Sequence, residues 1–474
     1  MNVNQWKNQH LFWRAAFGPP VASLAQLQTG DPNTLYKALL KASAKSPDYL
    51  NIVDNAMKGL TMGIGEAGKM NRRELTTEEK KNLRKQSRED LKNLNIHWLS
   101  EMAASGAQLR EKMAFFWHGH FACRNLNIYY QQLLLHTIRT NALGNFGELL
   151  REVSKSAAMI NFLNNNQNRK DHPNENFARE LMELFTMGRG NYAEKDIREA
   201  ARAFTGWGAN INGEFIFRRG LHDGGQKTFL GKTGNFTGDD ILDILLEQPT
   251  TAIFITRKLY RFFVNEDVDA LKVEWLAKRF YQSGYAIQEL LHDMFTSAWF
   301  FDPKNMGNRI KSPVELWVGM RRQLPLAMQD EAVQLVFQKL LGQILFYPPN
   351  VAGWAGGKTW IDGSSLLLRM RLPQLVAANE GWIMQPKQDD DEQMGRAAAP
   401  GRNFNADINW EHYCSFFAAI KKQDVWPSIS RFILQTPVTQ DPAIINKYTN
   451  LTARQLYISS ATINLMSCPE YQLC

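Results

Sequence analysis

One stretch, residues 171–207, constrains the fold most because it carries both a start and a stop signal for a helix. Asn174 is a good N-cap residue, Pro173 sets the entry and Gly188 is a good stop, which predicts a helix over residues 175–187. At about 100° per residue, the apolar positions of this segment share one face. They are Phe177, Leu181, Leu184 and Phe185. The pattern predicts a helix that packs one side against a core.

The opposite face of the same helix is polar. It carries Asn176, Arg179, Glu180 and Glu183, and a second predicted helix over residues 194–204 adds Arg202. Two interpretations remain open. The face is either a solvated surface with ion pairs such as Glu175 with Arg179, which spacing alone favours, or part of a functional site.

Helical periodicity and caps recur along the rest of the chain, whereas strand-type alternation occurs once. Residues 210–218 predict a hairpin that turns at Asn212 and Gly213. The expected fold is therefore mainly α: a multi-helix globular body with one small β-hairpin and long loops of functional type. Residues 1–383 are expected to form the main body, 384–408 a flexible insertion or linker, and 409–474 C-terminal helices that pack back on the body.

Composition excludes some classes of protein. The chain has 474 residues and a net charge of +8, and it has no run of about eighteen apolar residues, so we expect no membrane span. Its first residues lack the pattern of a secretory signal, which makes the cytoplasm the default location. Basic residues are dispersed among acidic ones, which makes nucleic-acid binding unlikely.

The sharpest candidate for chemistry combines residues from three segments. The metal-ligand candidates are His118 and His120, and the catalytic candidates are Glu180, Glu183, His222 and Asp223. A His-x-His pair chelates only where the backbone is extended, and Gly119 at a helix end permits this. The predicted cofactor is a divalent metal, namely zinc, manganese or iron. The alternatives are a metal-free acid–base site and purely structural roles.

Two further groups are candidates for binding a ligand. Arg202 and Lys227 are candidates for holding an anionic group such as phosphate or sulfate, together with Asn176 and Arg179 on the polar helix face. Residues 346–365 form a long loop that carries Trp354 and Trp360. The loop is either an aromatic platform for a glycan or another flat ligand, or a lid packed down by its own tryptophans.

Several blocks also carry a family resemblance. They are Asn-Glu-Asn-Phe-Ala-Arg-Glu-Leu (174–181), Phe-Trp-His-Gly-His-Phe (116–121), His-Asp-Gly-Gly-Gln-Lys (222–227), Arg-Ile-Lys-Ser-Pro-Val-Glu (309–315) and Pro-Pro-Asn-Val-Ala-Gly-Trp (348–354). The chain resembles the bacterial domain-of-unknown-function family number 1800 over nearly its whole length. Members of that family tend to be encoded beside proteins that look like sulfatases or phosphatases, so the resemblance implies a partner of that kind.

Two functional hypotheses follow from the sequence. The first is a metal-assisted or acid–base hydrolase of a polar substrate, either a glycan or a phosphorylated or sulfated compound. The second is a non-catalytic binding or scaffold protein that acts with the sulfatase-like or phosphatase-like partner. Convergence of His118 or His120, a carboxylate of the central helix and His222 in one cleft would favour the first hypothesis.

Overall fold

The computed structural model describes residues 3–53, 76–210, 212–378, 405–437 and 447–474, and these residues are mainly helical. The helices, in chain order, are α1 (Val3–Ala15), α2 (Leu24–Thr29), α3 (Pro32–Ala42), α5 (Thr77–Ala104), α6 (Gln108–His120), α7 (Ile128–Asn141), α8 (Phe146–Lys155), α9 (Ala157–Phe162), α10 (Asn176–Glu180), α11 (Glu194–Ala203), α12 (Gly238–Leu246), α13 (Pro249–Phe263), α14 (Ala270–Gln282), α15 (Ile287–Phe295), α16 (Pro313–Gln323), α17 (Val333–Leu340), α18 (Gly363–Ala378), α20 (Trp410–Ser415), α21 (Val425–Ile433) and α23 (Arg454–Met466). The predicted fold class is confirmed.

Side-chain caps explain where many of these helices begin. Asn127 accepts from the backbone N–H groups at the start of α7, and Asn145 does the same for α8. Ser312 and Glu315 form a capping box at the start of α16, where Pro313 is the first helical residue. Each cap satisfies backbone donors that have no partner inside the helix, which places the helix start at that residue.

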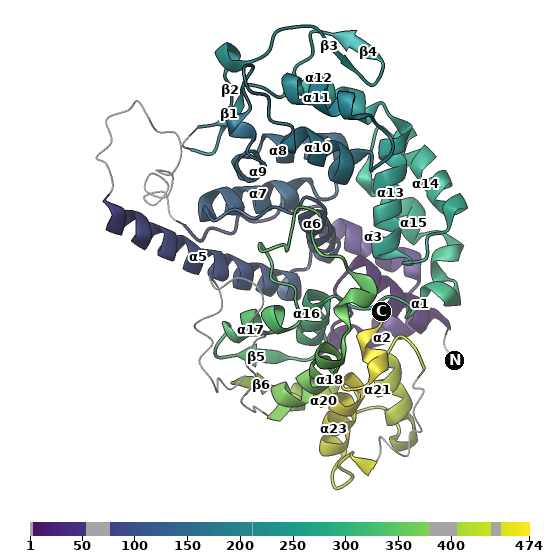
Figure 1. Ribbon diagram of the computed structural model, residues 1–474. Coiled ribbons are helices and arrows are strands. Elements are labelled where there is room, and N and C mark those ends of the chain that lie inside the picture. Colours follow the sequence, from purple (N-terminus) through teal and green to yellow (C-terminus); the bar gives the residue numbers. More distant parts are fainter. Residues whose placement is uncertain (1–2, 54–75, 211, 379–404, 438–446) are drawn as a thin grey trace.

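The helices form an upper and a lower group around α5 and α6 (Figure 1). Helices α7 to α12 lie in the upper group, α13 to α15 run down one edge, and α16 to α23 form the lower group. Buried apolar side chains of the described residues belong to one cluster that extends from Leu11 in α1 to Leu465 in α23. The two groups therefore share a core. The predicted linker lies largely outside the described residues, and the proposed domain boundaries stay predictions.

The described residues contain three two-stranded antiparallel sheets, where the sequence predicted one hairpin. The predicted hairpin is present: β1 (Trp207–Ala209) pairs with β2 (Phe215–Phe217), with Trp207 opposite Phe217. The two additional sheets are β3 (Lys227–Phe229) with β4 (Lys232–Gly234), and β5 (Leu326–Met328) with β6 (Ala406–Ile408). Strands of three residues are too short to show alternation, and the β5–β6 pair joins distant segments, so local patterns could not reveal either sheet.

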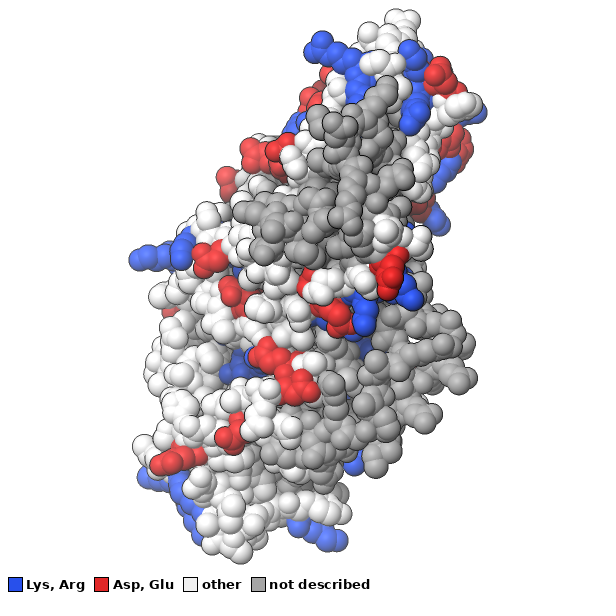
Figure 2. All heavy atoms as spheres, turned by 90° about the vertical axis from the view of Figure 1, so that its left-hand side faces the viewer, with Lys and Arg blue, Asp and Glu red and all other residues white. Residues whose placement is uncertain are grey.

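Charged side chains of both signs occur across the face shown in Figure 2. Lys and Arg lie near Asp and Glu on the described part of that face, in keeping with the dispersed charges of the sequence. Among the described helices, none is both long and apolar enough to cross a membrane.

Candidate functional site

His118 and His120 both lie inside α6, which continues through Gly119 to its end at His120. In a helix, residues i and i+2 point about 200° apart, so the extended backbone expected for a chelating pair is not found. Both side chains are buried, and they face different partners. The two histidines therefore do not form a joint metal-binding pair in this structure.

His118 is held against the long loop that follows α17. Its Nε2 accepts a hydrogen bond from the backbone N–H of Phe346 at 3.2 Å, which places the ring proton on Nδ1. Its ring stacks on Trp354, with centroids 5.6 Å apart and an interplanar angle of 22°. Burial lowers the pKa of His118 to about 3, so the ring is neutral at physiological pH.

His120 forms a hydrogen-bonded pair with Lys258 of α13. The Lys258 ammonium donates to Nδ1 of His120 at 3.1 Å, and Nε2 of His120 lies 3.2 Å from the carbonyl oxygen of Phe185. A lysine ammonium has only protons to offer, so the ring proton of His120 is on Nε2 and is donated to Phe185. Burial lowers the pKa of Lys258 to about 8, and burial together with Lys258 lowers the pKa of His120.

The central helix is not α-helical throughout. After α10 it continues as a π-helix, η3 (Leu181–Thr186), and Met187 and Gly188 both donate their backbone N–H to the Met182 carbonyl. Gly188 then ends the helix with a φ of 78°, as predicted. Because the N–H groups of Met187 and Gly188 both donate to the Met182 carbonyl, they do not donate to the carbonyls of Leu184 and Phe185 near the helix end. Those two carbonyls can therefore accept from side chains. Lys258 donates to Leu184 at 2.9 Å and His120 to Phe185, which satisfies both.

The polar face of the central helix is mostly ion-paired. Arg179 binds Glu175 at 3.0 Å and Glu194 of α11 at 2.9 Å, and Glu183 accepts from Arg189 at 2.5 Å. Glu180 has no hydrogen-bond partner among the described residues. Burial, and then the nearby charge of Glu183, raise the pKa of Glu180. The solvated, ion-paired interpretation holds for Arg179 and Glu183, and Glu180 remains available for proton transfer.

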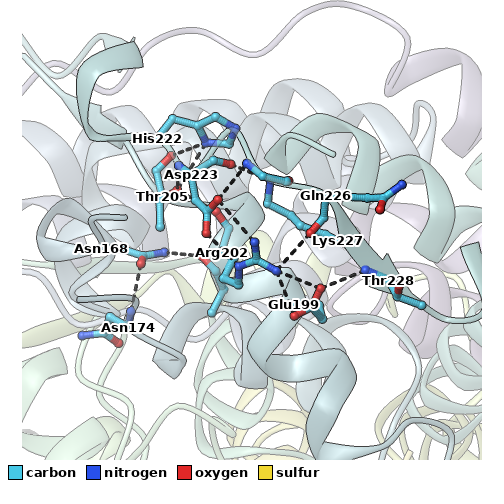
Figure 3. A network of polar contacts seen from close by, with 12 residues as sticks. Asn168, Asn174, Glu199, Arg202, Thr205, His222, Asp223, Gln226, Lys227 and Thr228 are labelled. Carbon is cyan, nitrogen blue, oxygen red and sulfur yellow. Dashed lines mark hydrogen bonds and ion pairs between the residues drawn. The ribbon is translucent and has the colours of Figure 1, made fainter. Parts of the chain in front are cut away.

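His222 lies in a network of polar contacts beyond the end of α11 (Figure 3). Its Nδ1 lies 3.0 Å from the carbonyl oxygen of Thr205, which can only accept, so Nδ1 carries the proton. The Nε2 atom consequently has its lone pair free, and it has no hydrogen-bond partner among the described residues. The ring is half-buried and meets the edge of Phe217. Because the hydrogen bond at Nδ1 fixes the tautomer, the Nε2 atom can accept a proton or bind a ligand.

Asp223, the next residue, is paired with Arg202 of α11 (Figure 3). Arg202 donates from Nε at 2.7 Å and from Nη2 at 3.3 Å, and its Nη1 reaches both oxygens of Glu199 at 3.1 Å. The hydrogen bond from Arg202 lowers the pKa of Asp223, which keeps that carboxylate ionised. The backbone N–H of Asp223 donates to the Thr205 hydroxyl at 2.8 Å. These contacts hold the loop in a fixed position on α11.

Lys227 supports the same loop from inside. Its ammonium is buried and donates to the carbonyls of Asp223 at 2.6 Å and Gly225 at 3.0 Å. Burial lowers the pKa of Lys227. The cations predicted to hold an anionic ligand, Arg202 and Lys227, thus bind the protein itself in this conformation.

Asn168 joins the start of the central helix to this network (Figure 3). Its side chain accepts from the backbone N–H of Asn174 at 2.8 Å and donates to the carbonyl of Ala201 at 2.8 Å. The other end of α11 carries Glu194, the partner of Arg179. Glu194 and Arg202 are eight residues apart, which at 1.5 Å per residue separates the two ends by roughly 12 Å.

The predicted site residues therefore fall into three places. Asn168 connects the start of the central helix to α11, which holds the His222 loop through the Arg202–Asp223 pair. Glu180 and Glu183 lie farther along the central helix, and His118 and His120 are buried in α6. No hydrogen bond between described residues joins His222 to either α6 histidine. Asn176 donates to the carbonyl of Leu163 at 3.3 Å, so its side chain is also held by the protein. The single cleft predicted from sequence stays a prediction: His120 contacts Phe185 of the central helix and Asn168 joins Asn174 to Ala201 of α11, but no hydrogen bond between described residues brings all three segments together.

The tryptophan loop packs directly on the end of α6. Gly353 has a φ of 78°, and a Cβ atom there would lie 2.5 Å from the carbonyl oxygen of Gly119, so only glycine permits this approach. Trp354 and Trp360 are both half-buried, and one face of Trp354 is covered by His118. The loop has features of a lid at Trp354, and the platform interpretation stays a prediction.

A metal ion needs several donor side chains that converge on one point. Within the described ranges, no group of three or more His, Cys, Asp or Glu side chains is arranged to hold a metal ion. The candidate ligands do not fit either, since both α6 histidines point at backbone groups and Asp223 is held by Arg202. Among the predicted site residues, the Nε2 atom of His222 and the carboxylate of Glu180 have no hydrogen-bond partner in the described part of the chain.

A match to a protein family shows which proteins the chain is related to. Residues 10–473 match the family described as "Protein of unknown function (DUF1800)". The chain belongs to the DUF1800 family. The comparisons with curated proteins and with solved structures gave no match. The sequence blocks that carried the resemblance are therefore parts of one DUF1800 unit that spans nearly the whole chain.

Three functional or supporting residues of this DUF1800 protein were not singled out from sequence. Thr205 orients His222, Lys258 caps the π-helix, and Asn168 connects α11 to the central helix. Thr205 lies inside the Ala-Arg-Ala-Phe-Thr-Gly-Trp block, which was a usable signal. Nothing local marks Lys258, because its partners are 74 and 138 residues away.

Proposed function

We propose that this DUF1800 protein is a hydrolase that uses His222 for acid–base catalysis on a polar substrate with a phosphoryl or sulfuryl group. The observation that carries the proposal is the fixed tautomer of His222. Because Thr205 accepts from Nδ1, the unpartnered Nε2 is positioned to take a proton from water. The Thr205 carbonyl would also stabilise the imidazolium that forms.

Two exposed cations beside His222 support an anionic substrate. Lys170 is placed by its backbone N–H, which donates to the Leu221 carbonyl at 2.9 Å, and the carbonyl of Arg219 accepts from the His222 N–H at 3.2 Å. The side chains of Lys170 and Arg219 are exposed and have no partner among the described residues. Exposed cations on residues whose backbone adjoins the loop of a free base suit a substrate that carries negative charge.

In this proposal, His222 Nε2 accepts a proton from water while the oxygen of that water attacks phosphorus or sulfur, and the ester oxygen leaves. Arg202 and Lys227 keep the loop rigid so that the Nε2 position is maintained. A divalent metal stays a prediction and is assigned no step, because Nε2 of His118, the ring of His120 and the carboxylate of Asp223 are bound by protein groups. Glu180, with its raised pKa, is kept as a candidate proton donor at the far end of the central helix.

The second candidate function is a non-catalytic binding or scaffold protein that acts with a sulfatase-like or phosphatase-like partner. The observation that favours it is that most predicted catalytic and binding side chains contact the protein itself. In that case the loop of His222, with Lys170 and Arg219, would bind an anionic group without turnover. For either function we propose a cytoplasmic location.

The test compares hydrolysis of nitrophenyl phosphate, nitrophenyl sulfate and nitrophenyl glycosides by the wild type and by His222→Gln. Loss of at least about 100-fold in kcat, with folding unchanged, is expected from the removal of a general base. His412→Gln is the matched control, because His412 is exposed on α20, far along the chain. Equal activity of wild type and His222→Gln would eliminate His222 as the base. Binding of the esters without turnover, lost in Lys170→Ala with Arg219→Ala, would establish the scaffold function instead.

A further inference from the structure

Three segments far apart in sequence meet around the last residues of the chain. Residues 309–311 pair with residues 472–474: Arg309 and Cys474 exchange two backbone hydrogen bonds of 3.2 and 2.8 Å, and Lys311 donates to the Gln472 carbonyl at 2.9 Å. Arg14 of α1 donates to the Cys474 backbone oxygen at 2.8 Å. Figure 1 shows this end of the chain beside α1. The Arg-Ile-Lys-Ser-Pro-Val-Glu block of the sequence lies at this junction, away from the His222 loop.

The junction holds a group of buried cations, which we call the cation cluster. Its members are Arg14, Lys112, Arg309, Lys311 and Arg369, all buried. Lys311 lies between two aromatic rings, 3.7 Å from the centroid of Trp13 and 3.8 Å from that of Tyr471. Such a concentration of buried positive charge requires negative charge nearby.

Protein carboxylates balance only part of this charge. Glu315 is the buried carboxylate that contacts the cluster, and it binds both Lys112 and Arg309. The charge of Glu266 also acts on Arg14 and Arg309, but within the described residues it forms no ion pair with either. In the described part of the chain, Glu315 is thus the carboxylate that forms ion pairs within the cluster, with two of its five cations. Burial lowers the pKa of Lys311 to about 7, and the nearby charge of Arg369 acts in the same direction.

The three arginines of the cluster also have buried N–H groups without acceptors. These are Nε and Nη1 of Arg14, Nε of Arg309 and Nη1 of Arg369, and the nearby Trp13 and Gln472 each have an unpartnered N–H donor as well. A buried donor without an acceptor is costly, and a charged one more so. Donors without acceptors are the surroundings that an oxyanion needs.

The arginines are close enough to act together. Burial lowers the pKa of Arg14, and the charge of the nearby Arg309 guanidinium, which binds Glu315, lowers it further. The Arg14 guanidinium binds the Cys474 carbonyl, and that of Arg369 donates to the Gln472 side chain at 3.0 Å and to the carbonyl of Lys311. Their contacts on the C-terminal segment fall within three residues, a length of roughly 7 to 10 Å in extended chain. Guanidinium groups around one short segment can share a ligand that offers several oxygen acceptors.

We propose that the cation cluster binds one small inorganic oxyanion of the phosphate or sulfate class. The anion supplies negative charge between α1, the segment before α16 and α18, and its oxygens accept from the unpartnered guanidinium N–H groups. This site is separate from the His222 loop and does not depend on the proposed hydrolase function.

The first test is to denature purified, extensively desalted wild-type protein and to measure released anions by ion chromatography. About one equivalent of phosphate or sulfate per chain is expected when the protein is purified in buffer that contains that anion. The two anions, supplied in separate preparations, show which is preferred. Release of neither would mean that the donors bind ordered water only, and the proposal would be overturned.

The second test measures Tm of the full chain against phosphate and sulfate, with chloride at matched ionic strength as reference. A rise in Tm specific to the oxyanion is expected in the wild type, because a ligand that binds the folded state stabilises it. The rise should disappear in Arg369→Gln and in Arg14→Gln. Arg322→Gln is the matched control: Arg322 is also largely buried but binds the carbonyls of Gly18 and Ala103, so its variant should keep the rise.

A double variant distinguishes the two proposed anion sites, the cation cluster and the surface beside the His222 loop. Lys170→Ala with Arg219→Ala removes the exposed cations beside His222, and the oxyanion-dependent rise in Tm should persist in it. A rise that is lost in this double variant and kept in Arg369→Gln would assign the effect to the surface and overturn the cation-cluster site. If the cluster variants fail to fold, the anion content of the wild type still decides the question.

Discussion

Lys258 Nζ lies 3.1 Å from Nδ1 of His120, and this contact sets the protonation of the histidine because a lysine ammonium can only donate. The same ammonium binds the Leu184 carbonyl, and His120 binds the next carbonyl, that of Phe185. Two side chains that are distant in sequence therefore complete the hydrogen bonds of the π-helix that follows Glu180. The position of Glu183 on that π-helix depends on this contact.

Replacement of this lysine tests that dependence. We expect Lys258→Met to lower the free energy of unfolding by about 1–3 kcal/mol, because a buried carbonyl and the His120 Nδ1 lose their donor. Urea unfolding monitored by circular dichroism measures the change. Lys272→Met is the control, since Lys272 forms a surface ion pair with Asp269 and should cost about 0–1 kcal/mol. Equal losses in the two variants would contradict the structural role of Lys258.

Stability should fall in mild acid because several histidines are buried as neutral rings. The pKa of His118 is lowered from 6.5 to about 3, and those of His10 and His120 are also lowered by burial. The unfolded state thus binds more protons below pH 6.5, so stability is fully present above that pH and is lost as the pH falls towards 3. His118 alone should cost about 1.4 kcal/mol at pH 5.5 relative to pH 7.5.

Denaturant titrations at pH 5.5 and 7.5 check this prediction. His118→Gln should show a smaller difference between the two pH values than the wild type, by about the contribution of one histidine. His412→Gln, at an exposed position, should leave the difference unchanged. A pH dependence identical in the wild type and His118→Gln would show that His118 is not held neutral.

Glu315 is the carboxylate on which the charge balance of the cation cluster depends most. Arg309 and Lys112 lower its pKa, although burial acts in the opposite direction, so it is ionised in the folded protein. We expect Glu315→Gln to cost about 3–5 kcal/mol, because removal of one partner leaves buried charges uncompensated. Glu247→Gln, at the surface partner of Lys232, should cost less than about 1 kcal/mol. A small effect of Glu315→Gln would refute this account of the cluster.

Two glycines of the tryptophan loop allow two contributions to stability to be compared: the close contact between the loop and α6, and the strain of a backbone with positive φ. Gly353 and Gly356 have nearly the same φ, 78° and 77°, but only a Cβ at Gly353 would meet the Gly119 carbonyl, at 2.5 Å. Alanine should be strained at either position because φ is positive, by at least about 1–2 kcal/mol, and the ψ of −175° at Gly356 lies in a region that only glycine adopts readily. Gly353→Ala should cost more than Gly356→Ala, and it should also change the fluorescence of Trp354. Equal costs would show that the contact between the loop and α6 does not constrain the fold.

Local sequence patterns predicted the elements whose signals are local. Asn174 and Gly188 marked the ends of the central helix, and Asn212 with Gly213 marked the turn of the β1–β2 hairpin. Caps and left-handed glycines act on backbone groups within a few residues, so their effect can be worked out without the rest of the chain. The family blocks likewise identified residues 116–121 and 222–227 as special before their contacts were known.

Tertiary structure alone decided what those special residues do. His118 and His120 share a helix and a motif, but one accepts from Phe346 and the other caps Phe185, because each meets a different segment of the fold. The π-helix and the role of Lys258 likewise arise from a partner helix more than 70 residues away. Burial and the choice of hydrogen-bond partner set the tautomer and the charge of a side chain. For these residues both depend on contacts between segments far apart in the chain, and they leave His222 with an unpartnered Nε2 that can accept a proton.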